Sequence, residues 1–244
     1  MGIDLKKMRK KLSELNNKGS GGRFWKPQDG KQDIRIVPTA DADPFKEFYF
    51  HYNIGQQGFL CPEKNYGDKC PACDFARKLY REGDDESIAQ ARDMTARQRY
   101  FSPVLVRGEE SLGVKIWSYS KTVYQELLNL VLNPDYGDIT DVDSGFDLTL
   151  EYGKAAGARF PSTNITPRRQ TSRLCADKTA EECTEILESV PDFDSLYTRT
   201  TTEEVQRLLD EHFVSDAEEL SSETAKYGSE STSVDKAFAD LAGS

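Results

Sequence analysis

The sequence has few of the residues that usually carry catalysis or membrane insertion. Its 244 residues include two histidines, two tryptophans and five cysteines. No apolar run approaches the roughly 18 to 20 residues that a membrane-spanning helix needs, and the N-terminal stretch lacks the apolar core of a signal peptide. A glycine-rich phosphate loop and a pair of histidines for acid–base chemistry are also missing. We therefore expect an intracellular, non-enzymatic protein whose thiols stay reduced.

Positive charge is also scarce, because the net charge of the chain is −10. A negative net charge by itself argues against a nucleic-acid partner, but the charges are unevenly distributed. Residues 1–26 carry eight Lys or Arg and two acids, whereas residues 203–244 carry eleven acids and three bases. A basic head and an acidic tail are typical of a protein whose ends meet different partners or each other.

The basic head contains apolar residues at helical spacing. Leu5, Met8, Leu12 and Leu15 recur every three or four positions among lysines and arginines, which predicts a short basic amphipathic helix. The stretch "NNKGSGGR" that follows is typical of a flexible joint. A helix separated from the body in this way is suited to docking on a partner, and a frayed terminus is the alternative.

The central part of the chain changes to the period of two that strands show. Five segments have this pattern: "DIRIVP", "FKEFYFHYN", "YFSPVLVRG", "LGVKIWSYS" and "FDLTLEYG". In the last, Phe146, Leu148, Leu150 and Tyr152 share one face, opposite Asp147, Thr149 and Glu151. Helices are predicted over 74–81 and 85–97, from Ser120, from the capping box Thr179 to Glu182, and from Thr201. These elements predict an α+β, mostly β chain that forms a small Greek-key barrel with peripheral helices.

Beyond residue 213 the composition predicts a disordered, acidic tail. The segment is rich in Ser, Thr, Glu, Asp and Gly and has few large apolar residues. Its end, "VDKAFADLAGS", is either a short docking motif or part of an inert solubilising tail.

Three of the five cysteines and one of the two histidines lie within 23 residues. The candidate ligands are His51, Cys61, Cys70 and Cys73. Two thiolates separated by two residues can bind one metal when a tight turn points both sulfurs inward, and "KCPAC" supplies a proline for that turn. Three Cys and one His complete the four ligands of a structural zinc site.

Two other interpretations of the cysteines stay open. A thioredoxin-type redox pair would explain Cys70 and Cys73 but not Cys61 and His51, and it requires a strand–motif–helix unit. Ordinary buried thiols are the second alternative. The remaining pair, Cys175 and Cys183, is expected to consist of unpaired core or surface thiols.

Aromatic residues alternate with bases in several segments. Proteins hold single-stranded nucleic acid by stacking bases on aromatic rings and by following the phosphates with Lys or Arg. The residues that form this pattern are Arg97, Arg99, Tyr100, Phe101, Lys115, Trp117, Tyr119, Lys121, Lys154, Arg159, Phe160, Arg168, Arg169 and Arg173. Aromatic residues on strands also fill cores, so each ring has two interpretations.

These features together resemble the replication single-stranded-DNA-binding proteins of T-even bacteriophages and their marine relatives. The similarity is strongest in "QDIRIVP", "HYNIGQQGFLCPEKNYGDKCPAC", "YFSPVLVRG" and "VKIWSYSKTVYQELLNLVL". The resemblance implies an oligonucleotide-binding (OB-fold-like) barrel with one structural zinc bound by His51, Cys61, Cys70 and Cys73. It also implies DNA contacts by Arg35, Tyr66, Arg97, Arg99, Tyr100, Phe101, Trp117, Tyr119 and Phe160.

The resemblance further assigns roles to the two ends of the chain. The basic segment would bind the neighbouring protomer, through Lys6, Lys7, Arg9, Lys10 and Lys11, and the tail would recruit replication and recombination proteins. The expected domains are a cooperativity segment (1–22), a DNA-binding core (23–213, with a zinc loop at about 48–82) and an acidic tail (214–244). The expected function is cooperative, sequence-independent binding of single-stranded DNA during phage replication, recombination and repair, in the cytoplasm of the infected host.

Two competing functions remain. A zinc-bearing adaptor that binds only proteins would bury Tyr100, Phe101 and Trp117. A zinc or redox enzyme would leave one member of the cysteine cluster free of metal.

Overall fold

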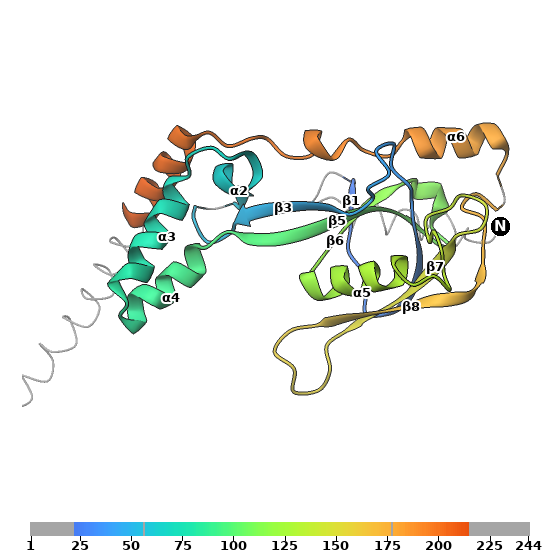
Figure 1. The fold of residues 1–244 in the computed structure, drawn as a ribbon, viewed down its shortest axis with the longest axis horizontal. Coiled ribbons are helices and arrows are strands. Elements are labelled where there is room, and N and C mark those ends of the chain that lie inside the picture. The colour runs from blue at the N-terminus through green and yellow to red at the C-terminus, as the bar shows by residue number, and fades with distance from the viewer. Residues whose placement is uncertain (1–21, 56, 177, 215–244) are drawn as a thin grey trace, which may run out of the picture. The chain divides into compact units, whose positions relative to one another are not determined.

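The computed structural model describes residues 22–55, 57–176 and 178–214, and these form two compact units (Figure 1). The sheet unit comprises 22–48 and 98–197, and the cysteine unit comprises 49–97 and 198–214. The predicted N-terminal helix and the tail beyond residue 214 lie outside the described residues. Within 22–214, none of the described helices has the length and apolarity that a membrane crossing requires.

The sheet unit is built on antiparallel strands whose spatial order is β1-β6-β5-β2-β7-β8, with only β1 and β6 parallel. The strands are β1 (Phe24–Trp25), β2 (Gly30–Ile36), β3 (Lys46–His51), β5 (Arg97–Val106), β6 (Lys115–Tyr119), β7 (Phe146–Gly153) and β8 (Ser162–Thr171). The boundary between the two units falls within β3 and β5. All five predicted strands are present, and β8 at the end of the order was not predicted.

Helices complete the core of the sheet unit. They are α5 (Lys121–Val131), α6 (Ala180–Glu188) and the short 3-10 helices η1 (Glu110–Leu112) and η2 (Phe193–Ser195). The apolar stripe of α5 buries Val123 and Leu127 against Trp117, Leu148 and other strand residues, as its periodicity predicts. Thr179 caps α6 in the predicted capping box with Glu182.

The cysteine unit consists of short elements around a separate apolar cluster. These are the end of β3, β4 (Phe59–Leu60), α2 (Pro62–Tyr66), α3 (Pro71–Glu82), α4 (Asp85–Met94) and a helix over 202–214. The helix α3 begins three residues earlier than predicted, because proline is favourable at the first helical position. Val205 and Leu209 of the last helix are buried in the same cluster as the three cysteines.

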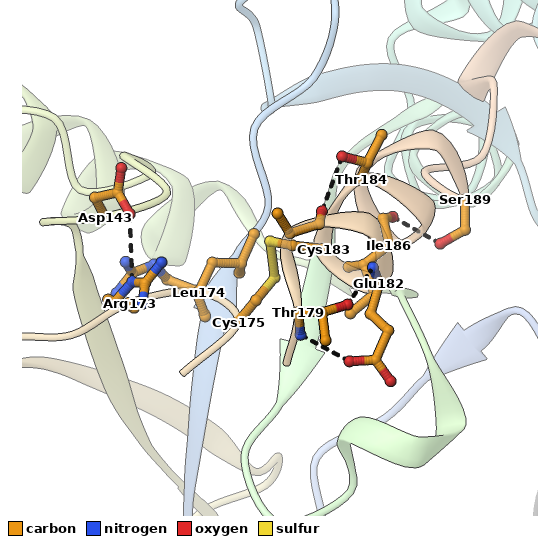
Figure 2. The surroundings of a disulfide bond; sticks show 12 residues. Asp143, Arg173, Leu174, Cys175, Thr179, Glu182, Cys183, Thr184, Ile186 and Ser189 are labelled. Carbon is orange, nitrogen blue, oxygen red and sulfur yellow. Dashed lines mark hydrogen bonds and ion pairs between the residues drawn. A yellow bond between two sulfur atoms is a disulfide. The ribbon is translucent and has the colours of Figure 1, made fainter. Parts of the chain in front are cut away.

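The expectation of unpaired thiols at Cys175 and Cys183 is wrong, because these residues form a disulfide (Figure 2). Their Cα atoms lie 5.7 Å apart, within the range that a disulfide requires. Cys175 follows β8 and Cys183 lies on α6, so the bond attaches this helix to the sheet unit. The pairing was not evident from the spacing of eight residues, because Cys175 lies before α6 and Cys183 lies on it.

Candidate functional site

Four potential metal ligands are held by the ends of secondary-structure elements in the cysteine unit. His51 ends β3, while Cys61 and Cys70 are the N-cap residues of α2 and α3, and Cys73 lies in the first turn of α3. All four are buried. The first turn of a helix carries partial positive charge, which favours thiolates. The N-terminal ends of α2 and α3 thus bring the three sulfurs into one cluster.

Three of the six distances between the donor atoms match those of a tetrahedral zinc ion, and all four donor atoms lie within 4.8 Å of one another. The Sγ atoms of Cys61 and Cys73 lie 3.5 Å apart, and Nε2 of His51 lies 3.4 Å from Sγ of Cys70 and 3.6 Å from Sγ of Cys73. Zinc–sulfur bonds of about 2.3 Å and zinc–nitrogen bonds of about 2.0 Å require donor separations of about 3.5 to 3.8 Å. The four residues thus form a metal-binding cluster that could hold one zinc ion.

A backbone carbonyl fixes the orientation of the histidine ring. Nδ1 of His51 lies 2.8 Å from the carbonyl oxygen of Met94. A carbonyl can only accept, so Nδ1 carries the hydrogen and Nε2 is left to bind metal. Metal-ligating histidines generally have such a partner. Sequence analysis did not identify Met94, because a carbonyl partner leaves no mark on residue type.

Protons are shared unequally in the cluster when no metal is bound. Hydrogen bonds from Cys70 and Cys73 lower the pKa of Cys61 far below its ordinary value, while hydrogen bonding to Cys61 and Cys70 raises the pKa of Cys73. Burial lowers the pKa of His51, but hydrogen bonds with Cys61, Cys70 and the Met94 carbonyl offset this and raise it to about 9. Zinc needs thiolates and a neutral imidazole, so binding the ion would release protons.

The loop between the second and third ligands is closed by specific contacts. Gly67 ends α2 with a φ of 76°, a left-handed conformation that favours glycine. Arg77 of α3 donates two hydrogen bonds to Glu63 of α2, at 2.7 and 3.0 Å. Such paired contacts fix both position and orientation. The cluster is therefore built into a structured loop.

The structure places five of the predicted DNA contacts in the interior of the sheet unit. Tyr100 and Phe101 are each 3% exposed, Trp117 is 1% exposed and Tyr119 is 4% exposed. Trp117 packs edge-on against Trp25, and the Tyr119 hydroxyl lies 2.7 Å from Ser102 Oγ. Burial raises the pKa of Tyr119 above its ordinary range, although the Ser102 hydrogen bond opposes the shift. These four rings pack in the core of the sheet unit in this structure, and base stacking requires an open ring face. Their contact with DNA stays a prediction.

Arg35 is the fifth residue of this group, and its contact with DNA likewise stays a prediction. Its side chain has no exposed surface and bonds to Asp147, to the Asp141 carbonyl and to both oxygens of Ser172. Burial lowers its pKa, which the charge of Asp147 partly restores. With every Nη atom directed at an internal acceptor, the guanidinium is a structural group.

The remaining predicted residues lie at or near the surface. Arg99, Lys121 and Phe160 are exposed in the sheet unit, as are Tyr66 and Arg97 in the cysteine unit. Lys115 is half-buried and donates to the carbonyl of Gly22. Arg199 lies over the Tyr66 ring, with its guanidinium carbon 4.5 Å from the ring centroid, so this tyrosine already has a cationic neighbour.

The hairpin that joins β7 and β8 combines an exposed ring with exposed bases. Phe160 is 69% exposed, and the guanidinium carbon of Arg159 lies 5.2 Å from its ring centroid. Lys154 is exposed at the start of the same loop, and Arg168 and Arg169 are exposed on β8. The hairpin extends as a long loop from the sheet unit (Figure 1). It has the residue types of a stacking and phosphate-binding surface.

Sequence analysis missed an aromatic group elsewhere in this unit. The half-buried rings of Phe24, Phe48 and Tyr197 surround Phe101, with centroid separations between 5.8 and 6.4 Å. Only the segment around Phe48 has a strand pattern, and Tyr197 lies in an irregular segment. Periodicity could not bring these rings together.

Comparison with known proteins is consistent with this chemistry. A family model described as "gp32 DNA binding protein like" matches residues 28–212. A search of curated proteins finds no significant match. The matched region covers the metal cluster, the strands β2 to β8 and the β7–β8 hairpin. The chain therefore belongs to the gp32-like family of DNA-binding proteins.

Proposed function

We propose that the chain is a non-enzymatic protein that binds single-stranded DNA cooperatively and without sequence preference. It acts in phage DNA replication, recombination and repair, in the cytoplasm of the infected bacterial host. The strands of the sheet unit form an OB-fold-like barrel, and one structural zinc ion is held by His51, Cys61, Cys70 and Cys73. Basic N-terminal segments link neighbouring protomers, and the acidic tail binds replication and recombination proteins.

The exposed β7–β8 hairpin is the observation that supports this function best. Phe160 lies on a loop and keeps 69% of its surface in water, so its ring is accessible to a base. Arg159 beside Phe160, and Lys154 exposed in the same loop, supply positive charge for phosphates. Family membership independently favours single-stranded DNA as the ligand.

Substitution of the exposed ring tests the proposal. Phe160→Ala should weaken binding to a labelled single-stranded oligonucleotide by about 5- to 150-fold, which corresponds to roughly 1–3 kcal/mol for one stacked base. Fluorescence anisotropy at two salt concentrations measures the affinity and its electrostatic part. A label on the DNA is needed because Trp25 and Trp117 are buried and report poorly on a surface contact.

Leu132→Ala is the matched control. Leu132 is 78% exposed in the same unit, just after α5, so its truncation removes similar exposed apolar surface without removing a ring. It should leave the affinity unchanged. Equal affinities of the two variants would contradict a stacking role for the hairpin.

One observation, the burial of three aromatic rings, favours the alternative function of a protein-binding adaptor. It predicts burial of Tyr100, Phe101 and Trp117, and all three are buried. However, an adaptor gives no reason for the basic hairpin or for membership of a DNA-binding family. Absence of wild-type binding to single-stranded DNA at low salt would favour the adaptor.

A further inference from the structure

The sheet unit has an acidic groove that the proposed DNA contacts do not use. It is lined by residues 38–41, Lys46 and the segment from α6 through η2, and it has a volume of about 740 Å³. Leu187 and Val190 are half-buried in its wall, and Phe193 is buried beneath it. The groove therefore offers apolar contacts as well as charge.

Negative charge predominates on this surface. Residues 179–198 contain six acids and no Lys or Arg. Glu188, Asp192 and Asp194 line the groove, and none of them forms an ion pair within the described part of the chain. The one lysine of the lining, Lys46, is already paired with Asp41 and Asp43. The groove repels DNA and attracts a cationic ligand.

The wall of the groove is held in a defined position. Figure 2 shows Cys183 of α6 joined to Cys175, and the hydrogen bonds between Thr179 and Glu182 that cap the same helix. Ile186 and Leu187 pack with Cys183 against a buried cluster that includes Leu105. A helix attached by a covalent bond and an apolar face can present its glutamates in a fixed array.

We propose that this groove binds the basic amphipathic segment 5–15 of a second copy of the chain. That segment carries five Lys or Arg, one acid and four large apolar residues at helical spacing. Charge and apolar surface therefore match on the two sides. The inference rests on the proposed function, since copies bound side by side on one DNA strand meet at high effective concentration.

Charge reversal in the groove tests the contact in the full chain. Glu188→Lys with Asp194→Lys should weaken self-association without DNA by roughly tenfold at low salt, because two attractive contacts become repulsive. Glu188 ends α6, where lysine suits the helix dipole, and the cap of η2 is Asp192 rather than Asp194. Sedimentation velocity measures association, and circular dichroism checks the fold.

The control variant carries Glu109→Lys with Asp135→Lys. Both acids are exposed in the same unit, away from the groove lining, so the net charge changes equally. This variant should associate like wild type. Because their charge changes are equal, the groove and control variants should bind a short oligonucleotide that holds one copy with equal affinity, while the groove variant loses cooperativity on long single-stranded DNA and the control variant keeps it.

Charge exchange between copies provides the decisive comparison. Lys10→Glu with Lys11→Glu should also weaken association, and mixing this variant with the groove variant should restore it. Wild-type association of the groove variant, or no restoration in the mixture, would overturn the inference. If the groove variant does not fold, weakened association of the N-terminal variant supports the inference and wild-type association overturns it. Failure of wild type to bind the short oligonucleotide instead overturns the proposed function.

Discussion

The environment of Arg35 shows how a single residue changes role when both faces of its strand are covered. Alternation in "DIRIVP" places Ile34 and Ile36 on one face, which predicts a solvent-facing arginine between them. In the structure, Asp141, Asp147 and Ser172 cover that second face and accept hydrogen bonds from the guanidinium. They are separated from Arg35 by 106 to 137 positions in the sequence. Local periodicity carries no information about such distant segments.

Asp147 should be one of the most sensitive positions for stability. It accepts hydrogen bonds from Arg35 and Arg107, at distances from 2.8 to 3.3 Å. Asp147→Asn keeps the shape but leaves a buried guanidinium without its counter-ion, so the free energy of unfolding should fall by about 3–5 kcal/mol. Urea denaturation followed by circular dichroism measures the change.

The control for that substitution is Asp143→Asn. Asp143 pairs with Arg173 at the surface, where both side chains are at least 66% exposed. Exposed pairs contribute about 0–1 kcal/mol. Equal unfolding midpoints for the two variants would show that the buried pair makes no special contribution.

Single residues of the metal cluster could be predicted because the information is local. Cysteine and histidine are rare in this chain, and four of them fall within 23 residues. The stacking residues could not be predicted in the same way. An aromatic residue beside basic residues has the same sequence pattern whether its ring is buried, as that of Trp117 on β6 is, or exposed, as that of Phe160 on the β7–β8 loop is.

At the scale of elements, the apolar strands of the sheet could be predicted from the sequence, whereas the edge strand β8 could not. The strands β2, β5, β6 and β7 are rich in β-branched, aromatic and other apolar residues, and all were predicted. The strand β8 reads "STNITPRRQT" and buries no residue fully. A strand at the end of a sheet can be polar on both faces and can contain proline, so its sequence resembles a loop.

The zinc loop is the element whose stability should depend on metal. Cys73→Ser removes one of four ligands, so the loop loses binding free energy that contributes directly to folding. We expect loss of bound zinc and a lower melting temperature for the cysteine unit. Metal analysis and calorimetry measure the two effects.

Cys183→Ser is the control in that experiment. It removes a sulfur of the disulfide and leaves the metal cluster intact. It should retain one zinc per chain, with three thiols protected until a chelator is added. A Cys73→Ser protein that melts at the wild-type temperature would contradict the structural assignment of the metal.

At the scale of the whole molecule, the described residues form two compact units, and the predicted DNA-binding core (23–213) spans both of them. The cysteine unit takes in 49–97 and the helix 202–214, so it extends well beyond a zinc loop of about 48–82. A local sequence pattern cannot show that the chain returns to the cysteine unit after residue 197. The packing of Val205 and Leu209 in that unit reveals it.

Deletion of residues 215–244 should tighten binding to single-stranded DNA. The helix that precedes the tail runs through Val214, one residue beyond the predicted boundary. The deleted stretch carries seven acids and two bases, so its removal lowers repulsion and competition for basic surfaces. The gain in affinity should be largest at low salt and should shrink as salt screens the charges. An unchanged affinity throughout an anisotropy salt titration would contradict this expectation.

The Cys175–Cys183 bond gives this chain two sulfur sites with opposite redox requirements. The cluster of Cys61, Cys70 and Cys73 needs thiolates to hold a metal, and oxidation would destroy it. The disulfide is stable only where no strong dithiol opens it. Samples prepared with and without a reductant are therefore two distinct molecules, which share a metal cluster and differ in the attachment of α6. Binding data from this protein acquire a clear meaning only when the redox history of the sample is stated.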